Sequence, residues 1–285
     1  MPKHISIETK EAIVNDYRKK PVAIGAIAEK YGLCQPTVVK ILSQYHVKLW
    51  PKRFLFSPDL KENYFKEIDS QDKAYYLGLI TTDGCVYRKN QDFAFLAIEL
   101  QKEDGYILEG FMKEMRCNRK LVYSKRSNTL TATVTSVDVV HDLERYHVYP
   151  RSSLTQRFWA EVPDSYLASY LRGLVDGDGS FGLYARPERP LSRRKQFCMC
   201  SGSEVFLEGF IDKLVEALGV MRPRINSDPS CNAYDTRWTR KDDLEAIISF
   251  LYSASGPYFV RKKEVAERIL ADIRQHRDNG RLTAS

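Results

Sequence analysis

The chain has 285 residues, of which 43% are hydrophobic, and a formal net charge of +7. This length supports one large core or two to three smaller ones, and no uncharged apolar run of about eighteen residues offers a membrane span. Since residues 1–10 lack an apolar segment behind their charges, we expect no signal peptide, and a cytoplasmic protein that stays in the compartment where it is made.

The positive charge is concentrated at the N-terminal end, where residues 1–55 hold ten Lys or Arg against four acids. Such an end is typical of a region that binds a polyanion. In the same region, apolar residues recur at helical spacing. The pattern predicts three short helices, over 7–19, 23–31 and 35–45.

The second and third of these helices are joined by a turn that contains Gly32, and Pro36 lies in the first turn of the third helix. Glycine favours a helix end, and proline is tolerated at a helix start. The pattern resembles the helix-turn-helix family, which implies an all-α DNA-binding domain over residues 1–50. In that family Gln35, Thr37 and Lys40 would face the major groove. A three-helix bundle that packs on the rest of the chain is the alternative.

Residues 51–72 carry prolines and scattered charges without a period, which favours a linker.

An internal repeat follows. The segment 75–84, Tyr-Tyr-Leu-Gly-Leu-Ile-Thr-Thr-Asp-Gly, recurs 95 residues later as Tyr-Leu-Arg-Gly-Leu-Val-Asp-Gly-Asp-Gly, and Leu-Glu-Gly-Phe at 108–111 recurs 99 residues later. Two similarities in the same order, at nearly the same offset, indicate a duplicated fold of roughly a hundred residues.

Each copy shows the same order of predicted elements, αββαββα, which defines an α+β architecture. The first copy, residues 73–150, is predicted as a helix ending at Gly84, strands 85–87 and 93–101, a helix 105–115, strands 121–124 and 129–135, and a helix from Ser136 to Tyr146. The second copy, residues 151–285, is predicted as a helix 165–177, strands 180–184 and 196–201, a helix 203–218, strands near 225 and over 234–239, and helices 240–252 and 257–275.

Glycines at the same place in both repeated helices need an explanation, because Gly78 and Gly173 each weaken a helix interior by roughly 1 kcal/mol. Two such helices related by a pseudo-two-fold axis would use the glycines for close contact, and their ends would then bring Asp83 and Asp178 together. Paired carboxylates at helix C-termini repel unless a cation lies between them. Oxygen ligands favour Mg²⁺ over zinc, with Mn²⁺ as the alternative.

The paired segments resemble the LAGLIDADG motif of homing endonucleases, and the resemblance runs from about residue 63 to about residue 274. It implies two pseudo-symmetric repeats that form a DNA-binding saddle, and a monomer that cuts both strands of a long duplex site. In that family Asp83 and Asp178 would be the metal-binding catalytic acids, helped by the backbone carbonyls of Thr82 and Gly177. The first copy departs from the motif at Thr81, a position that we interpret as a helix cap.

The resemblance also implies a basic residue near each catalytic centre. Lys262 matches that element in the second copy. In the first copy Ser152 stands where lysine is common, so Arg151 would substitute or one strand would be cut more slowly. Gln101 would orient water. DNA contacts are expected from basic residues beside predicted strand turns: Arg88, Lys89, Arg119, Lys120, Lys125, Arg126, Arg151, Arg193, Arg194, Lys195, Arg237 and Arg240.

The six cysteines form no Cys-x-x-Cys pair, so we predict reduced thiols and no zinc site. Cys198 and Cys200 would lie on one face of a half-buried strand, with a soft metal site as the alternative.

Two other functions stay open on the same fold: a nuclease-inactive DNA-binding regulator and an RNA maturase. A protein that only borrows the helix-turn-helix would leave the paired acids unexplained.

Overall fold

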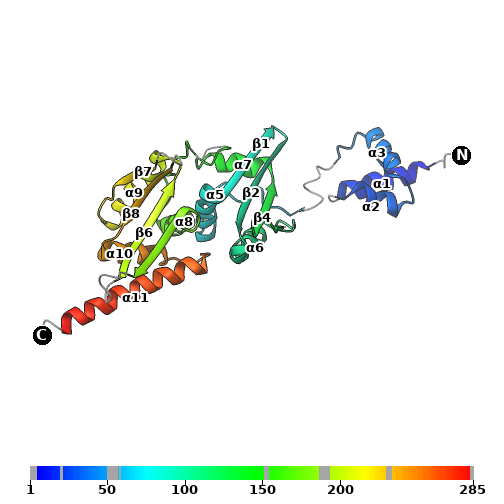
Figure 1. The fold of residues 1–285 in the computed structure, drawn as a ribbon. Coiled ribbons are helices and arrows are strands. Elements are labelled where there is room, and N and C mark those ends of the chain that lie inside the picture. The colour runs from blue at the N-terminus through cyan, green and yellow to red at the C-terminus, as the bar shows by residue number, and fades with distance from the viewer. Residues whose placement is uncertain are drawn as a thin grey trace. The chain divides into compact units, whose positions relative to one another are not determined.

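The computed structural model describes residues 5–19, 22–49, 57, 59–150, 154–185, 193–228 and 233–282. The chain divides into two compact units, residues 1–61 with 112–119 and residues 62–111 with 120–285. Figure 1 shows the elements of both. In the described part of the chain, every helix is too short or too polar to cross a membrane.

The N-terminal unit contains three helices, α1 (Ile7–Lys19), α2 (Ile24–Lys30) and α3 (Gln35–Gln44), close to the predicted ranges. Gly32 adopts φ of 61°, and the Leu33 amide donates to the Ala28 carbonyl at 2.8 Å, which closes α2 with a left-handed turn. The helices enclose a small core of their own: Ile13, Val14, Tyr17, Ile27, Ala28, Val38, Ile41 and Leu42.

The remaining elements form two copies of αββαββα, as the sequence predicts, and one further helix ends the second copy. The first copy contains α5 (Gln71–Asp83), β1 (Gly84–Asn90), β2 (Phe93–Gln101), a 3-10 turn (Lys102–Asp104), α6 (Gly105–Glu114), β3 (Val122–Ser124), β4 (Thr129–Thr135) and α7 (Val137–Glu144). The second contains α8 (Asp164–Asp178), β5 (Gly179–Ala185), β6 (Arg193–Ser201), α9 (Glu204–Leu218), β7 (Ile225–Asp228), β8 (Ala233–Trp238), α10 (Lys241–Leu251) and α11 (Val260–Leu282).

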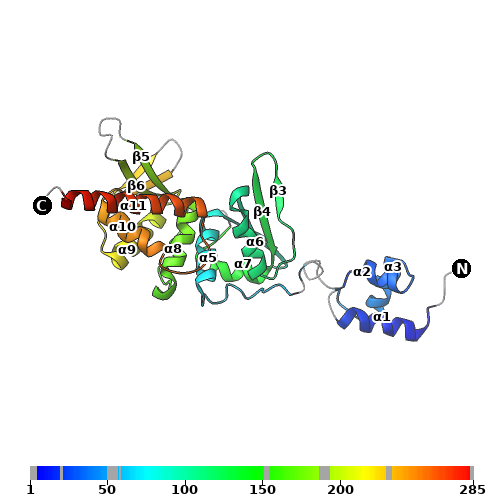
Figure 2. The same ribbon diagram turned by 90° about the horizontal axis from the view of Figure 1, so that it is seen from below.

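The two copies build two antiparallel sheets with equivalent strand orders, β1-β2-β4-β3 and β5-β6-β8-β7. We call them the first and the second sheet. In each, helices pack on one face, and none of the described helices packs on the other. Figure 2 shows α9 and α10 on one side of β5 and β6. Along β2, Leu96 and Ile98 are buried on the covered face, whereas Phe95 and Glu99 lie on the uncovered face.

The helices α5 and α8 lie side by side between the two sheets (Figure 1), and their contact explains the repeated glycines. A Cβ atom added at Gly78 would overlap the carbonyl oxygen of Tyr170 and lie 3.1 Å from the Cα of Gly173. A Cβ atom at Gly173 would overlap the carbonyl oxygen of Tyr75 in the same way. The predicted close approach of the two helices is therefore present.

Part of the segment interpreted as a linker is packed rather than free. Phe65 is fully buried and its ring lies 6.5 Å from that of Phe111, and the Tyr166 hydroxyl donates to the Asp69 carbonyl at 2.7 Å. Ser57 is also buried and its hydroxyl accepts from the Asn118 amide at 2.9 Å, so packed residues begin at least at residue 57 in the described part of the chain.

Candidate active site

The two motif acids are the last residues of α5 and α8. The next residues, Gly84 and Gly179, have extended backbone and begin β1 and β5 directly. A Cβ atom added at Gly177 would lie 3.0 Å from Oδ2 of Asp83, so the Asp83 carboxylate lies against the residue that precedes Asp178. The structure brings the two predicted acids together at the adjoining helix ends.

Burial and neighbouring charges shift the pKa values of both acids. Partial desolvation and the charge of Asp178 raise the pKa of Asp83 to about 7, and Lys262 and Arg261 oppose the rise. Desolvation also raises the pKa of Asp178, opposed by Lys262. Two partly desolvated carboxylates, one of which disfavours the charged form of the other, are a suitable place for a divalent cation.

The donor set fits a hard divalent ion. In the described residues, no cluster of three or more Asp, Glu, His or Cys side chains is arranged for a metal. Two carboxylates would therefore have to be completed by backbone carbonyls, water and phosphate, which is the coordination that Mg²⁺ commonly accepts. The predicted helper carbonyl of Gly177 also accepts a long hydrogen bond, 3.2 Å, from Lys262.

Lys262 lies in the first turn of α11 and is buried. Its ammonium group donates to the carbonyls of Val175 at 2.9 Å, Asp176 at 2.5 Å and Gly179 at 2.6 Å, in addition to Gly177. Burial lowers the pKa of Lys262 to about 8. The lysine thus caps the C-terminus of α8, where unpaired carbonyls and the helix dipole favour a cation.

A buried acid holds the start of α11. Oδ2 of Asp176 accepts hydrogen bonds of 2.8 Å from the Phe259 amide and from the Tyr75 hydroxyl of the other repeat. Burial raises the pKa of Asp176 to about 6, although these hydrogen bonds oppose the rise. At the equivalent place in the first repeat, the Thr81 hydroxyl donates to the Leu77 carbonyl of its own helix at 2.8 Å. The two halves of the site therefore differ.

Two further contacts from the first repeat reach the same helix start. The Tyr106 hydroxyl accepts from the Val260 amide at 2.8 Å, and Asp104 pairs with Arg261 at 2.9 Å. Asp104, Tyr106 and Asp176 were not among the predicted site residues. Only Asp176 carried a signal, since it is the first acid of the second motif.

Two predicted residues of the first half-site, Arg151 and Ser152, lie outside the described residues. Gln101 is exposed at the end of β2, three residues beyond Ile98, which pairs with Gly84. A cavity of about 570 Å³ adjoins Asp178 and the end of α5. Its lining includes Thr82, Gly84, Tyr149, Gln156, Asp178 and Ser201.

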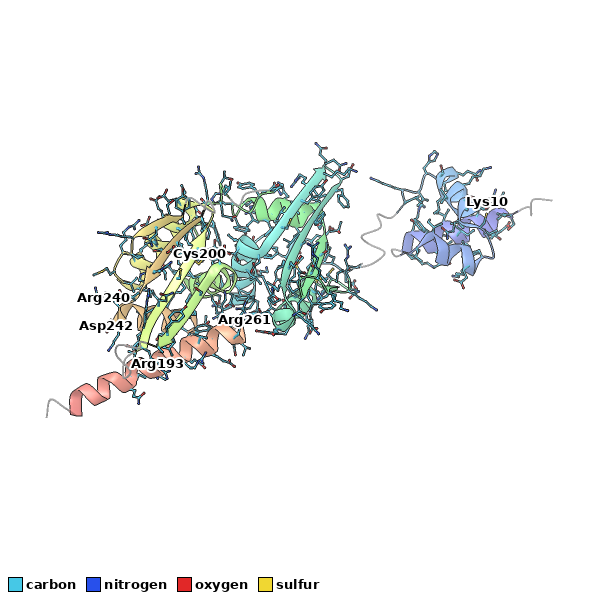
Figure 3. All side chains as sticks on the ribbon, in the orientation of Figure 1. Lys10, Arg193, Cys200, Arg240, Asp242 and Arg261 are labelled. Carbon is cyan, nitrogen blue, oxygen red and sulfur yellow. The ribbon has the colours of Figure 1, made fainter. Side chains whose placement is uncertain are left out.

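Most of the basic residues proposed for DNA contact are accessible. Strand register places Arg194 and Arg237 on the uncovered face of the second sheet, and Cys198 lies opposite Arg237 with its sulfur 3.7 Å from that of Cys200. Lys89 is exposed at an irregularity of β1, where the register shifts between Arg88 and Asn90. Figure 3 shows Arg193 and Cys200 near opposite ends of β6. The others are exposed in loops or turns: Arg119, Lys120, Lys125, Arg126 and Arg240.

Arg88 and Lys195 correct the prediction, because both lie on covered faces. Arg88 follows the buried Val86 in the strand alternation and pairs with Glu144 of α7 at 2.9 Å. Lys195 is only 6% exposed and pairs with Asp272 of α11 at 2.5 Å. These two contacts join strands to helices, so neither side chain is placed to meet DNA.

In the N-terminal unit, Gln35 and Lys40 lie on the exposed face of α3 and line an open depression along it. Thr37 is half-buried, and its hydroxyl lies 3.0 Å from the Cys34 sulfur. Two of the three predicted recognition residues are therefore exposed.

Comparison with known proteins finds similarity in structure but not in sequence. No protein-family profile and no curated protein sequence matches the chain. Solved structures that match include the I-LtrWI LAGLIDADG homing endonuclease bound to target DNA (15% identity, TM-score 0.52, 76% of this chain and 92% of that one). The LAGLIDADG meganuclease I-AabMI bound to uncleaved DNA matches at 13% identity and TM-score 0.53, over 72% and 91% of the two chains.

The I-SmaMI LAGLIDADG homing endonuclease bound to cleaved DNA is a third match, at 15% identity and TM-score 0.51, over 72% of this chain and 90% of that one. The structural neighbours are thus double-motif LAGLIDADG homing endonucleases. The chain has their saddle fold, with two four-stranded sheets and a central helix pair.

Proposed function

We propose that the chain is a site-specific DNA endonuclease that cuts both strands of a duplex with a divalent metal, Mg²⁺ or alternatively Mn²⁺. The observation that carries the proposal is the meeting of Asp83 and Asp178 at the ends of two packed helices. An inactive regulator or a maturase would not need both acids in this arrangement. The solved neighbours bound to target, uncleaved and cleaved DNA support the substrate class.

The position of the acids relative to the sheets indicates which faces of the sheets would bind DNA. Strands β1 and β5 begin directly after Asp83 and Asp178, so the acids lie where the two sheets begin. Helices cover one face of each sheet, and a duplex would therefore meet the uncovered faces. On the second sheet, Arg237 is held by Asp235 at 3.0 Å and suits the recognition of guanine in the major groove.

Each residue of the site would have a separate role in the reaction. Asp83 and Asp178, with the carbonyls of Thr82 and Gly177, would hold the divalent ion. When bound, such an ion activates a water and neutralises negative charge on phosphate oxygens. Lys262 keeps the end of α8 in place through its carbonyl contacts and adds positive charge beside both acids. Gln101 would orient water at the uncovered face.

The proposed organisation assigns residues 1–50 to a DNA-binding helix-turn-helix domain, 51–72 to a connection, and 73–150 and 151–285 to the two repeats. Both acids belong to one chain, so a monomer would be sufficient. The basic N-terminal end would add contacts to a DNA segment outside the cleaved site.

Cleavage of a plasmid library with randomised inserts tests the proposal. Protein with Mg²⁺ is expected to produce double-strand ends enriched in one long sequence, and EDTA or the double variant Asp83→Asn/Asp178→Asn is expected to abolish them. If the wild-type protein binds an enriched sequence with Mg²⁺ or Mn²⁺ present and leaves it intact, the endonuclease proposal is wrong and a DNA-binding regulator replaces it.

A further inference from the structure

The uncovered face of the first sheet differs in chemistry from that of the second. Four threonines of β4, at 129, 131, 133 and 135, share this face with the aromatic residues Tyr87 and Phe95. Within strands β1–β4, all described, register leaves Glu99 as the one charged side chain on it, and the exposed Lys89 lies at the register shift of β1. A face with so few cations is poorly suited to phosphates, and it suits contact with base edges.

Glu99 is the carboxylate on this face, and two threonines fix it. Its Oε1 accepts from the Thr129 hydroxyl at 2.8 Å, and its Oε2 lies 3.5 Å from the Thr131 hydroxyl. The residue is exposed, and the described residues offer it no ion-pair partner within 4.0 Å. A carboxylate has about four acceptor sites, so acceptor capacity remains for an outside donor.

On a DNA duplex the donor would have to come from a base, because phosphate oxygens repel a carboxylate. In the major groove, guanine presents two acceptors and thymine an acceptor and a methyl group. Adenine presents an amino donor next to the N7 acceptor, whereas the edge of cytosine presents an amino donor alone. A group that only accepts hydrogen bonds therefore matches cytosine best.

We infer that Glu99 is a specificity-determining residue that reads one cytosine through its exocyclic amino group, in the half-site beside the first repeat. Ile98 pairs with Gly84, the residue after Asp83, so Glu99 lies at the end of the sheet near the acids. The cytosine would thus lie close to the cleaved phosphates. Phe95 is four residues away along β2, about 13 Å at the usual strand rise, and meets bases farther out. This inference rests on the proposed function.

Binding selection from a randomised duplex library tests the inference, with the full chain carrying Asp83→Asn/Asp178→Asn so that the DNA stays uncut. In this parent, one position near the centre of the selected site should prefer cytosine by about tenfold. Adding Glu99→Gln should move the preference at that position to adenine, because an amide offers both a donor for N7 and an acceptor for the amino group. Its oxygen can still accept from Thr129.

The matched control is Glu109→Gln, which removes the same charge from an exposed position on α6, away from the uncovered face. It should leave the selected sequence unchanged. The inference is wrong if Glu99→Gln selects the parent sequence, or if it changes enrichment equally at all positions while its melting temperature equals that of the parent. A parent that enriches no sequence would instead contradict the proposed function itself, and the inference with it.

Discussion

Substitution of Gly78 by alanine tests the contact between α5 and α8 on which the site depends. The added Cβ would overlap the Tyr170 carbonyl oxygen and lie 2.9 Å from the Leu174 nitrogen and 3.1 Å from the Gly173 Cα. All three are backbone atoms, so no side chain can rotate away and the helices must separate. Overpacking costs about 1–3 kcal/mol, and we expect the upper end here.

Alanine is the better helix former by about 1 kcal/mol, which offsets part of that cost and leaves a net destabilisation of about 2 kcal/mol. For a unit of this size such a loss lowers the melting temperature by about 4–8 °C, which circular dichroism can follow. The control is Gly25→Ala in α2, where the new Cβ would meet only the side-chain amide of Gln35, at 3.2 Å. A Gly78→Ala protein as stable as the wild type would refute the close-packing argument.

Three further predictions concern charged groups. At pH 8 in EDTA, Asp83→Asn should raise the free energy of unfolding, measured with urea, by about 1–2 kcal/mol. This value is smaller than the full pKa shift would give, because solvent screens a partly exposed carboxylate. The pKa of Asp83 is about 7 in the folded protein, above its ordinary value of 3.8. Between these two pH values the folded form binds more protons than the unfolded form, so wild-type stability falls as the pH rises from 3.8 to 7. Lys262→Met should lower stability by about 2 kcal/mol, because it leaves carbonyls at the end of α8 without a donor. Lys195→Ala should lower the melting temperature without a specific loss of DNA affinity, whereas Arg194→Ala should weaken DNA binding at unchanged stability.

Each of these has a distinguishing control. At pH 5 the stability difference between Asp83→Asn and the wild type should shrink, and an equal difference at both pH values would remove the titration argument. Lys263→Met changes the neighbouring, half-buried lysine and should cost much less than Lys262→Met. A Lys195→Ala protein that is fully stable but binds DNA poorly would restore Lys195 to the interface.

Much of the fold could be predicted because the sequence contains two copies of the same pattern. Gly78 and Gly173 signalled the helix contact, and the same predicted order of elements in each copy signalled two similar sheets. The meeting of Asp83 and Asp178 followed from that symmetry. Each of these inferences uses only local spacing and repetition, which survive in a single sequence.

The face of the sheet on which a strand side chain lies was harder to predict. Lys195 stands two residues before the buried Phe197, and Arg88 two residues after the buried Val86. Strand alternation therefore places both on covered faces, whereas their proximity to a turn indicated exposure. The contacts of Asp176 with Tyr75 and Phe259 could not be predicted, since they join residues 101 and 83 positions apart.

The most direct test of the central claim measures cutting of each strand of the selected site by Asp83→Asn and Asp178→Asn separately. Because the two carboxylates share one electrostatic centre, each single variant should slow cleavage of both strands at least about a hundredfold while still binding the site. A single variant that cuts either strand at the wild-type rate would contradict a shared catalytic centre.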